Sequence, residues 1–299
     1  MSRAIRSARL SWVAALLTIA AVTHGDPPAA CDDCAAWNAD QKPFRVFGNT
    51  YYVGVRGLSS ILITSDQGHV LIDGDLPESA PKIAASVREL GFRIEDVKLI
   101  LNSHVHFDHA GGIAELQRLS GATVAASPAS ARVLKRGRSG RDDPQFGSLR
   151  GIAPVANVRI VNGAETLRVG PLELTAHPTP GHTPGGTTWT WKSCENERCL
   201  NVVYADSLTP VSAQGFLFTR NTTYPNALID FEISFRTLDG LACDILLTPH
   251  PEASDLWTRL VRRDEGGETD ALVDASACRH LADRARRQLK ARVASEQGG

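Results

Sequence analysis

A run of metal-binding residue types at the end of a strand-like segment constrains the fold of this chain more than any other feature. The run is His104-Val105-His106-Phe107-Asp108-His109. Residues 97–101 before it are apolar and β-branched, which predicts a buried strand, and a helical pattern begins behind the glycine pair 111–112. Alternate side chains of an extended segment share a face, so His104 and His106 can point to one side. The following turn brings Asp108 and His109 round from another direction.

Imidazoles and a carboxylate are typical ligands of zinc, and sites with three protein ligands and an open position for water are catalytic. An isolated His-x-His pair is weak evidence, because histidine pairs are common on protein surfaces. The longer pattern, placed between a strand and two glycines, predicts two neighbouring metal sites.

Two further histidines lie in loops that proline stiffens. His182 lies within Thr179-Pro180-Gly181-His182-Thr183-Pro184-Gly185-Gly186, and His250 lies between two prolines directly after the strand-like run 244–248. Proline restricts the backbone, so each ring has a defined direction, as a ligand requires. His177 competes with His182, but it precedes Pro178 at a strand end, and we interpret it as structural.

Composition narrows the class of protein. The chain has 299 residues, 42% of them hydrophobic, which suffices for a sizeable core in one large domain or two small ones. The formal net charge of −1 gives no electrostatic reason to expect a nucleic acid or an anionic membrane as partner. A small-molecule enzyme or a neutral binding protein fits these properties.

The N-terminus predicts export. Arginines precede the apolar run 10–22, which is too short to span a membrane, so we interpret residues 1–25 as a signal peptide and residues 26–299 as a single domain without a stable membrane span. The expected location is the periplasm. A lipoprotein with its lipid on Cys31 is the alternative, but Pro28 stands where an aliphatic residue is needed.

Six cysteines agree with an oxidising compartment. Cys194 and Cys199 flank a hairpin tip, so a disulfide there would staple the hairpin. Cys243 precedes the strand 244–248 and Cys278 lies in the C-terminal helix, so their disulfide would hold that helix on a sheet. The remaining two, Cys31 and Cys34, either pair with each other or remain free thiols.

Strand-like and helical segments alternate along the chain, which predicts layered α and β structure. Four strands at 44–47, 51–55, 60–64 and 69–73 are expected to form one sheet. A second group is expected at 158–161, 166–169, 172–176, 187–191 and 200–204. Asp73 ends an apolar strand and either orients a metal ligand or caps a turn. The long polar loop 138–157 contains Gln145, a candidate for contact with a substrate.

The order of these motifs resembles that of the metallo-β-lactamase superfamily, above all the third subclass of class B β-lactamases. The resemblance covers almost all of the chain after the signal peptide. It implies an α/β fold, a four-layer αβ/βα sandwich with two mainly antiparallel sheets flanked by helices and the metals at one edge. It also implies two Zn²⁺ ions, the first held by His104, His106 and His182 and the second by Asp108, His109 and His250.

The subclass depends on the residues after Tyr204. Other subclasses place a cysteine ligand near here, whereas this chain has Asp206 and Ser207. Ser207 and Thr209 resemble positions that hold the substrate carboxylate, although a serine is expected at 209, and Gln145 resembles a contact to the substrate carbonyl. Asp206 is ambiguous, because thioesterases of the glyoxalase type use an aspartate in a similar context to bridge both metals.

The resemblance implies zinc-dependent hydrolysis of the β-lactam amide bond of penicillins, cephalosporins and carbapenems, hence antibiotic resistance. A monomer would act on this small-molecule substrate, and Asp108 would orient the zinc-bound hydroxide. The alternative within the superfamily is a zinc-dependent thioester or lactone hydrolase. A zinc-storage protein without turnover is a third possibility, but structural zinc sites are usually closed by four protein ligands and each site here supplies three.

Overall fold

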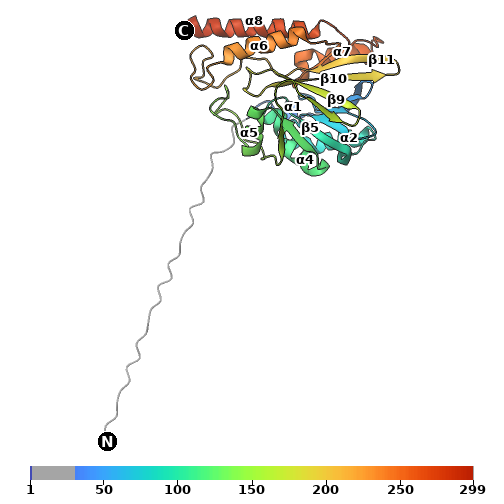
Figure 1. Cartoon of the computed structure of the whole chain (residues 1–299), viewed down its shortest axis with the longest axis horizontal. Helices are drawn as coiled ribbons and strands as arrows, with labels where there is room; N and C mark the ends of the chain where they lie inside the picture. Colours follow the sequence, from blue (N-terminus) through green and yellow to red (C-terminus); the bar gives the residue numbers. More distant parts are fainter. Residues whose placement is uncertain (2–30, 299) are drawn as a thin grey trace.

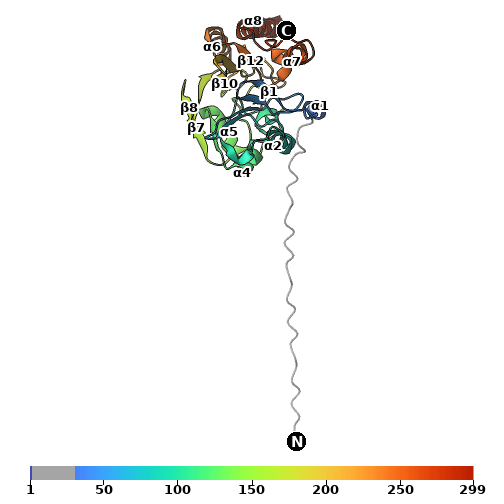
Figure 2. The ribbon, with the colours of Figure 1, turned by 90° about the vertical axis from the view of Figure 1, so that its right-hand side faces the viewer.

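Two mixed β-sheets pack face to face, and helices cover the outer face of each (Figures 1 and 2). The computed structural model describes residue 1 and residues 31–298. The signal peptide predicted at residues 1–25 therefore lies, apart from residue 1, outside the described residues.

The first sheet has seven strands in sequence order, and α2 (Ala80–Glu89), α4 (Ile113–Ser120) and α5 (Pro128–Arg136) follow β4, β5 and β6 respectively. The strands β1 to β4 pair antiparallel, as expected for strands joined by short turns, whereas β4 to β7 pair parallel because a helix connects each to the next. The strands are β1 (Phe44–Phe47), β2 (Thr50–Tyr52), β3 (Ile61–Ile63), β4 (His69–Ile72), β5 (Val97–Leu101), β6 (Thr123–Ala126) and β7 (Val158–Ile160).

The second sheet has the order β12-β11-β10-β9-β8 and is antiparallel except for the pair β11 and β12. Its helical cover is α6 (Ala227–Gly240) and α8 (Ala277–Gly298), which lie side by side in Figure 1. The strands are β8 (Thr166–Val169), β9 (Leu172–Pro178), β10 (Thr187–Glu195), β11 (Arg198–Tyr204) and β12 (Ile245–Leu247).

The remaining helices are short or lie at the ends of the sheets. They are α1 (Cys34–Trp37), α3 (Phe107–Ala110) and α7 (Leu256–Asp264), with 3₁₀ turns η1 (Pro77–Ser79), η2 (Ile94–Asp96) and η3 (Pro251–Ser254).

Strands that are buried on both faces explain the four layers. In β3, Ile61 and Ile63 point into the core between the sheets, whereas Leu62 packs under the helices of the first sheet. Trp189 and Tyr204 of the second sheet fill the same central core and are fully buried. Alternate side chains of one strand thus serve two cores, which is why these strands are apolar throughout.

The predicted αβ/βα sandwich is confirmed, with two corrections. The first sheet is not mainly antiparallel, because helices join β4 to β7 and make those pairs parallel. One strand is also reassigned. Residues 158–161 were expected in the second sheet, but β7 lies at the edge of the first, where Val158 pairs with Val124 of the parallel strand β6. The helix α5 connects these two strands, so the unit is a strand-helix-strand crossover, which returns the chain to the same sheet.

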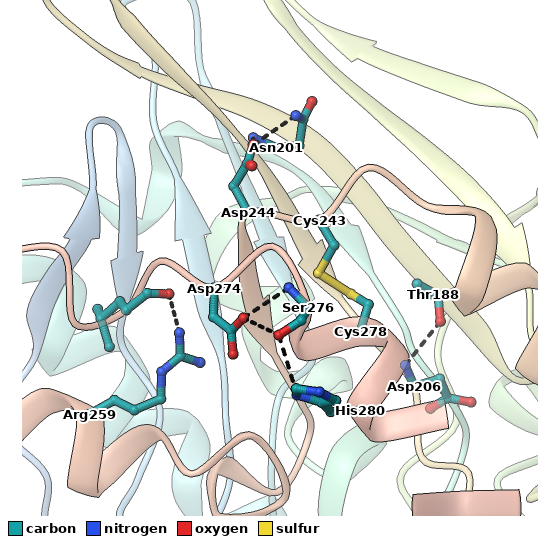
Figure 3. The surroundings of a disulfide bond; sticks show 11 residues. Thr188, Asn201, Asp206, Cys243, Asp244, Arg259, Asp274, Ser276, Cys278 and His280 are labelled. Atoms are coloured by element: carbon teal, nitrogen blue, oxygen red, sulfur yellow. Dashed lines mark hydrogen bonds between the residues drawn. A yellow bond between two sulfur atoms is a disulfide. The ribbon is translucent and has the colours of Figure 1, made fainter. Parts of the chain in front are cut away.

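Three disulfides are present, Cys31–Cys34, Cys194–Cys199 and Cys243–Cys278, and they include both pairs expected from the sequence. Figure 3 shows the third bond joining the segment before β12 to the first turn of α8. Hydrogen bonds anchor the chain close to each of the two cysteines of this disulfide. Asp244 accepts hydrogen bonds from the backbone and side chain of Asn201 on β11, and Asp274 accepts from the backbone and hydroxyl of Ser276 before α8.

We expect replacement of Cys243 and Cys278 by alanine to lower the free energy of unfolding by about 4 kcal/mol, because the bond closes a long loop in the unfolded chain. The two cysteines are 35 residues apart. Urea denaturation followed by circular dichroism measures the loss. The matched control replaces Cys194 and Cys199, which are 5 residues apart, and its expected loss is about half as large. Equal losses in the two variants would contradict this account.

Candidate metal centre

The candidate ligands come from three segments, two loops and a loop with the short helix that follows it, which the fold brings to one edge of the sandwich. The first loop follows β5 and leads into α3, the second joins β9 to β10, and the third follows β12. Because β12 runs parallel to β11, the segments that follow these two strands leave the sheet on the same side.

Three histidine rings form the first cluster. The ring centroid of His104 lies 4.7 Å from that of His106 and 4.9 Å from that of His182, and the rings of His106 and His182 are also 4.9 Å apart. All three residues are buried. One nitrogen from each lies within 4.8 Å of the others, which is the arrangement of a metal site.

Asp108, His109 and His250 form the second cluster beside the first. The Asp108 Oδ2 atom lies 3.2 Å from Nε2 of His109 and 3.3 Å from Nε2 of His250. The His109 ring lies 4.5 Å from that of His104, so the clusters are adjacent. The structure thus gathers all six residues proposed from the sequence into two groups of three.

The first-cluster rings are oriented by polar partners on the nitrogen away from the centre. The Nδ1 atom of His104 lies 2.7 Å from Oδ1 of Asp206, and Nε2 of His106 lies 3.2 Å from Oδ2 of Asp143. The Nδ1 atom of His182 donates to the carbonyl oxygen of Thr209 at 2.8 Å. Such outer contacts fix the tautomer and direction of a ligand ring.

The sequence analysis did not identify Asp143 as a residue of the site. It lies in the long polar loop after α5, two residues before Gln145, and no motif marks it. The only sequence signal was the unusual length of that loop. Asp206 was recognised as ambiguous. The structure places its Oδ1 on the outer nitrogen of His104, whereas its buried Oδ2 has no hydrogen-bond partner among the described residues.

Burial and mutual proximity lower the pKa values of His104, His109 and His182, which favours their neutral forms, whereas the Asp108 carboxylate stays charged. Burial lowers the pKa of His104 well below its ordinary value, and burial together with His104 and His106 lowers the pKa of His182 to about 3. Burial would raise the pKa of Asp108, but His109 and His250 outweigh it and hold that pKa well below its usual range. For His106, burial lowers the pKa, but the hydrogen bond with Asp143 outweighs it, so the net pKa is raised.

The donor set fits divalent metal ions. The inner Nε2 of His104 is buried without a hydrogen-bond partner in the described part of the chain, and it faces a centre lined by other imidazoles. Neutral imidazoles and ionised carboxylates are the forms that bind metal. The centre is therefore built to bind metal, as expected from the sequence.

Asp73 supports the loop before His104 and touches neither cluster. Its Oδ1 accepts from the backbone of Ser103 at 2.8 Å, and its Oδ2 accepts from the hydroxyls of Ser103 at 2.6 Å and Tyr204 at 2.9 Å. Burial raises its pKa to about 7. Asp73 contacts no ligand ring directly within the described residues, so orientation of a ligand by Asp73 would act through Ser103, the residue before His104.

Comparison with known proteins identifies the family. A family model described as "Metallo-beta-lactamase superfamily" matches residues 53–195. The structure is similar to that of the Rm3 metallo-beta-lactamase, with 59% sequence identity, a TM-score of 0.88, and coverage of 90% of this chain and 99% of that chain. The chain belongs to the metallo-beta-lactamase superfamily.

A second solved structure supports the subclass. MEM-A1, a subclass B3 metallo-beta-lactamase isolated from a soil metagenome library, is 55% identical, with a TM-score of 0.86 and coverage of 88% of this chain and 99% of that chain. The resemblance to the third subclass of these lactamases is therefore confirmed, as is assignment to a superfamily of hydrolases.

Curated relatives match over shorter stretches. A hydroxyacylglutathione hydrolase of Rhodopseudomonas palustris (strain BisA53) is 36% identical over 109 residues, 36% of this chain and 33% of that protein. The uncharacterized protein YobT of Bacillus subtilis (strain 168) is 31% identical over 145 residues, 47% of this chain and 59% of that protein. The chain thus spans between a third and three fifths of the length of these two curated relatives.

Two of the residues proposed for substrate binding contact ligand rings of the metal centre, and His177, interpreted as structural, lies outside it. The Nε2 atom of Gln145 lies 3.4 Å from Nδ1 of His106, and Thr209 contacts His182 through its carbonyl oxygen. Ser207 directly follows Asp206 and is partly exposed. His177 bonds to the hydroxyl of Thr190 at 2.8 Å, outside both clusters, in keeping with a structural role.

No helix within the described residues is both long and apolar enough to cross a membrane.

Proposed function

We propose that the chain hydrolyses the amide bond of β-lactam antibiotics with two zinc ions. The observation that carries this proposal is the pair of adjacent three-residue clusters, each with its donor atoms within 4.8 Å of one another. The subclass B3 lactamase MEM-A1 supports it, because the likeness extends over 99% of that chain.

His104, His106 and His182 would hold one ion, and Asp108, His109 and His250 would hold the other. When bound, zinc lowers the pKa of a water molecule from 15.7 to about 7 and polarises a carbonyl group, so it supplies a nucleophile at neutral pH. Each cluster has three protein ligands, which leaves room for water and substrate, as catalytic zinc sites require.

Asp108 has a second task beyond holding metal. Its carboxylate is ionised and lies against both His109 and His250, so its direction is defined on two sides. We infer that it accepts a hydrogen bond from the attacking water and turns the oxygen lone pair toward the carbonyl carbon of the lactam. The oxygen then adds to that carbon, the carbon–nitrogen bond of the ring breaks, and the proton that the water loses is transferred to the ring nitrogen, which leaves a carboxylic acid and an amine.

A cavity beside the centre gives the substrate a place. It has a volume of about 510 Å³, and its wall includes Ser207, Thr209 and His250, with Arg284 of α8 among the other lining residues. This volume lies in the range of small-molecule sites, about 300 to 1,000 Å³. We infer that the hydroxyls of Ser207 and Thr209 hold the substrate carboxylate and that the amide of Gln145 contacts the carbonyl group.

Replacement of Ser207 by alanine is expected to raise KM about tenfold for a carboxylate-bearing β-lactam and to leave kcat nearly unchanged. One hydrogen bond to a charged group contributes about 1.5 kcal/mol, and this bond forms equally in the ground and transition states. Steady-state kinetics with nitrocefin measures both constants. The methyl ester of the substrate is the control, because it lacks the carboxylate, so KM for the ester is expected to stay unchanged. A selective fall in kcat would contradict the assignment.

A thioester or lactone hydrolase is the competing proposal. It draws on the partial match to a hydroxyacylglutathione hydrolase and to an N-acyl homoserine lactonase of Bacillus sp, which is 28% identical over 151 residues. The aspartate that this alternative needs between the metals is Asp206, whose Oδ1 instead lies 2.7 Å from the outer nitrogen of His104. The geometry therefore favours the lactamase.

The deciding experiment compares substrates. Purified protein is assayed with nitrocefin, meropenem and S-lactoylglutathione at equal concentrations, each with and without a chelator. We expect chelator-sensitive turnover of both β-lactams and little turnover of the thioester. The opposite ranking would establish the alternative, and zinc binding without turnover of any substrate would favour a storage protein.

Export to the periplasm and action as a monomer remain part of this proposal. The signal peptide that predicts export lies outside the described residues apart from residue 1. The three disulfides support an oxidising compartment. Cell fractionation and gel filtration test the two statements.

A further inference from the structure

His250 differs from the histidines of the first cluster in how its ring is held. His104, His106 and His182 each have a polar partner on the outer nitrogen. In the second cluster, Nδ1 of His109 is buried without a partner, and the structure of residues 31–298 gives Nδ1 of His250 no hydrogen bond. The His250 side chain is also 34% exposed, so burial alone does not fix its ring.

An aromatic contact takes the place of that hydrogen bond. The indole of Trp37 lies against the His250 ring, with a centroid separation of 5.3 Å and an interplanar angle of 59°. The His109 ring lies 4.8 Å from the same imidazole. Trp37 therefore limits the rotation of a ring whose Nε2 must face Asp108.

Trp37 is itself held by the frame that holds the His250 loop. The backbone amide of Gly57 donates to the carbonyl oxygen of Trp37 at 2.9 Å. Two residues later, the amide of Ser59 donates to the carbonyl oxygen of Pro249 at 2.8 Å. One short segment, residues 57–59, thus sets the distance between the tryptophan and the histidine.

The N-terminal segment that carries Trp37, residues 31–40, is fastened at further points. The Cys31–Cys34 disulfide closes it on itself, and Cys34 is buried in a small apolar cluster with Leu58. Asn38 accepts hydrogen bonds at its side chain from the hydroxyl of Ser79 at 2.8 Å and at its carbonyl oxygen from Nζ of Lys82 at 2.6 Å. These contacts fasten the segment to the fold next to the centre.

We propose that Trp37 is a positioning residue for His250 and that it sets the affinity of the second metal site. The inference rests on the two-zinc function proposed above. It assigns to the N-terminal segment a part in the metal centre that the ligand motifs do not reveal.

The Trp37→Ala variant is expected to bind the second zinc ion about tenfold more weakly, the lower end of the effect of outer-shell contacts on metal affinity. The affinity of the first ion is expected to stay unchanged. The Trp37→Phe variant keeps an aromatic ring against His250 and is expected to restore most of the lost affinity. Titration of metal-free protein with Zn²⁺ against a chromophoric chelator measures both constants.

A second variant leaves Trp37 in the sequence and moves it. A Cβ atom added at Gly57 would lie 2.6 Å from Cα and 2.7 Å from Cδ1 of Trp37, closer than non-bonded atoms tolerate. Gly57 does not adopt a positive φ angle, so the Gly57→Ala variant acts through this contact and not through backbone strain. We expect Gly57→Ala, like Trp37→Ala, to lower the affinity for the second zinc ion.

The control is Trp191→Phe, which removes a buried indole that donates to Thr50 at 2.9 Å, away from both clusters. It is expected to lower stability and leave both zinc affinities unchanged. Thermal unfolding followed by circular dichroism verifies that every variant is folded, and the absorption spectrum of the Co²⁺-loaded protein reports the geometry of the second site independently of turnover.

The outcomes separate this inference from the function on which it rests. If the wild-type protein binds two ions and folded Trp37→Ala binds both with wild-type affinity, the role of Trp37 is overturned and the two-zinc proposal stands. Fewer than two ions in the wild-type protein would overturn the two-zinc proposal and the role of Trp37 with it. Selective weakening of the second ion in both Trp37→Ala and Gly57→Ala supports the inference.

Discussion

Removal of the metal is expected to lower the turnover of nitrocefin at least about 1,000-fold, because loss of even one strong electrostatic stabiliser costs about 100- to 1,000-fold. The ions also supply the nucleophile, and no side chain replaces that contribution at neutral pH. Dialysis against a chelator followed by a turnover assay measures the loss, with residual zinc determined in the same sample.

Added zinc is expected to restore turnover of the stripped protein, whereas magnesium is not, because imidazole-rich sites do not suit that ion. Circular dichroism of the stripped sample separates loss of metal from loss of fold. Undiminished opening of the β-lactam ring by protein without zinc would end the proposal, whatever the geometry of the two clusters.

The second large effect is expected at Asp206. The Asp206→Ala variant loses the carboxylate that lies 2.7 Å from Nδ1 of His104, so that ring is no longer held in one tautomer and direction. Removal of such an outer contact lowers metal affinity about 10- to 100-fold. We expect this loss at the first ion, with the second retained. Titration with Zn²⁺ and turnover at limiting zinc measure the two consequences.

A neighbouring glycine gives an independent route to the same displacement. A Cβ atom at Gly186 would lie 2.4 Å from Oδ2 of Asp206 and 2.4 Å from the carbonyl oxygen of Thr179, so the Gly186→Ala variant is expected to displace the carboxylate together with the backbone of the His182 loop, while leaving Asp206 in the chain. Exposed Asp66 provides the control, because Asp66→Ala removes a carboxylate from a surface turn.

The same variants distinguish two roles of Asp206. An aspartate that bridges both metals would, when removed, weaken both ions together. Removal of an aspartate that only orients His104 would weaken the binding of the first ion alone. Loss of both ions in Asp206→Ala would therefore favour the thioesterase-like arrangement over the one proposed here.

Much of the centre was predictable because the relevant constraints are local. A strand followed by a tight turn places His104, His106, Asp108 and His109 within a few residues of one another. Proline on both sides of His250 and around His182 restricts the backbone wherever those loops end. The choice of His182 over His177 followed from the same reasoning, and His177 indeed bonds to Thr190 outside the clusters.

Partners that are distant in sequence were not predictable in this way. Asp143 reaches His106 from a loop 37 residues away, and Trp37 reaches His250 across most of the chain. Neither lies in a motif, because a carboxylate or an indole at such a position is ordinary until the fold brings it next to a ligand. The strand at 158–160 was placed in the wrong sheet for a related reason, since its own residues do not specify which edge it joins.

Residue order and spacing were therefore sufficient for the layered α and β pattern, the six candidate ligands and the resemblance to the superfamily. The residues that orient those ligands, the position of Asp206 against His104 and the sheet that receives β7 emerged only from the folded chain. The physical reason is the distance along the sequence over which each constraint acts. Hydrophobic periodicity, proline and glycine act over a few residues, whereas the pairing of sheet edges and the contacts behind a ligand ring are decided by the packing of segments that lie far apart in the sequence.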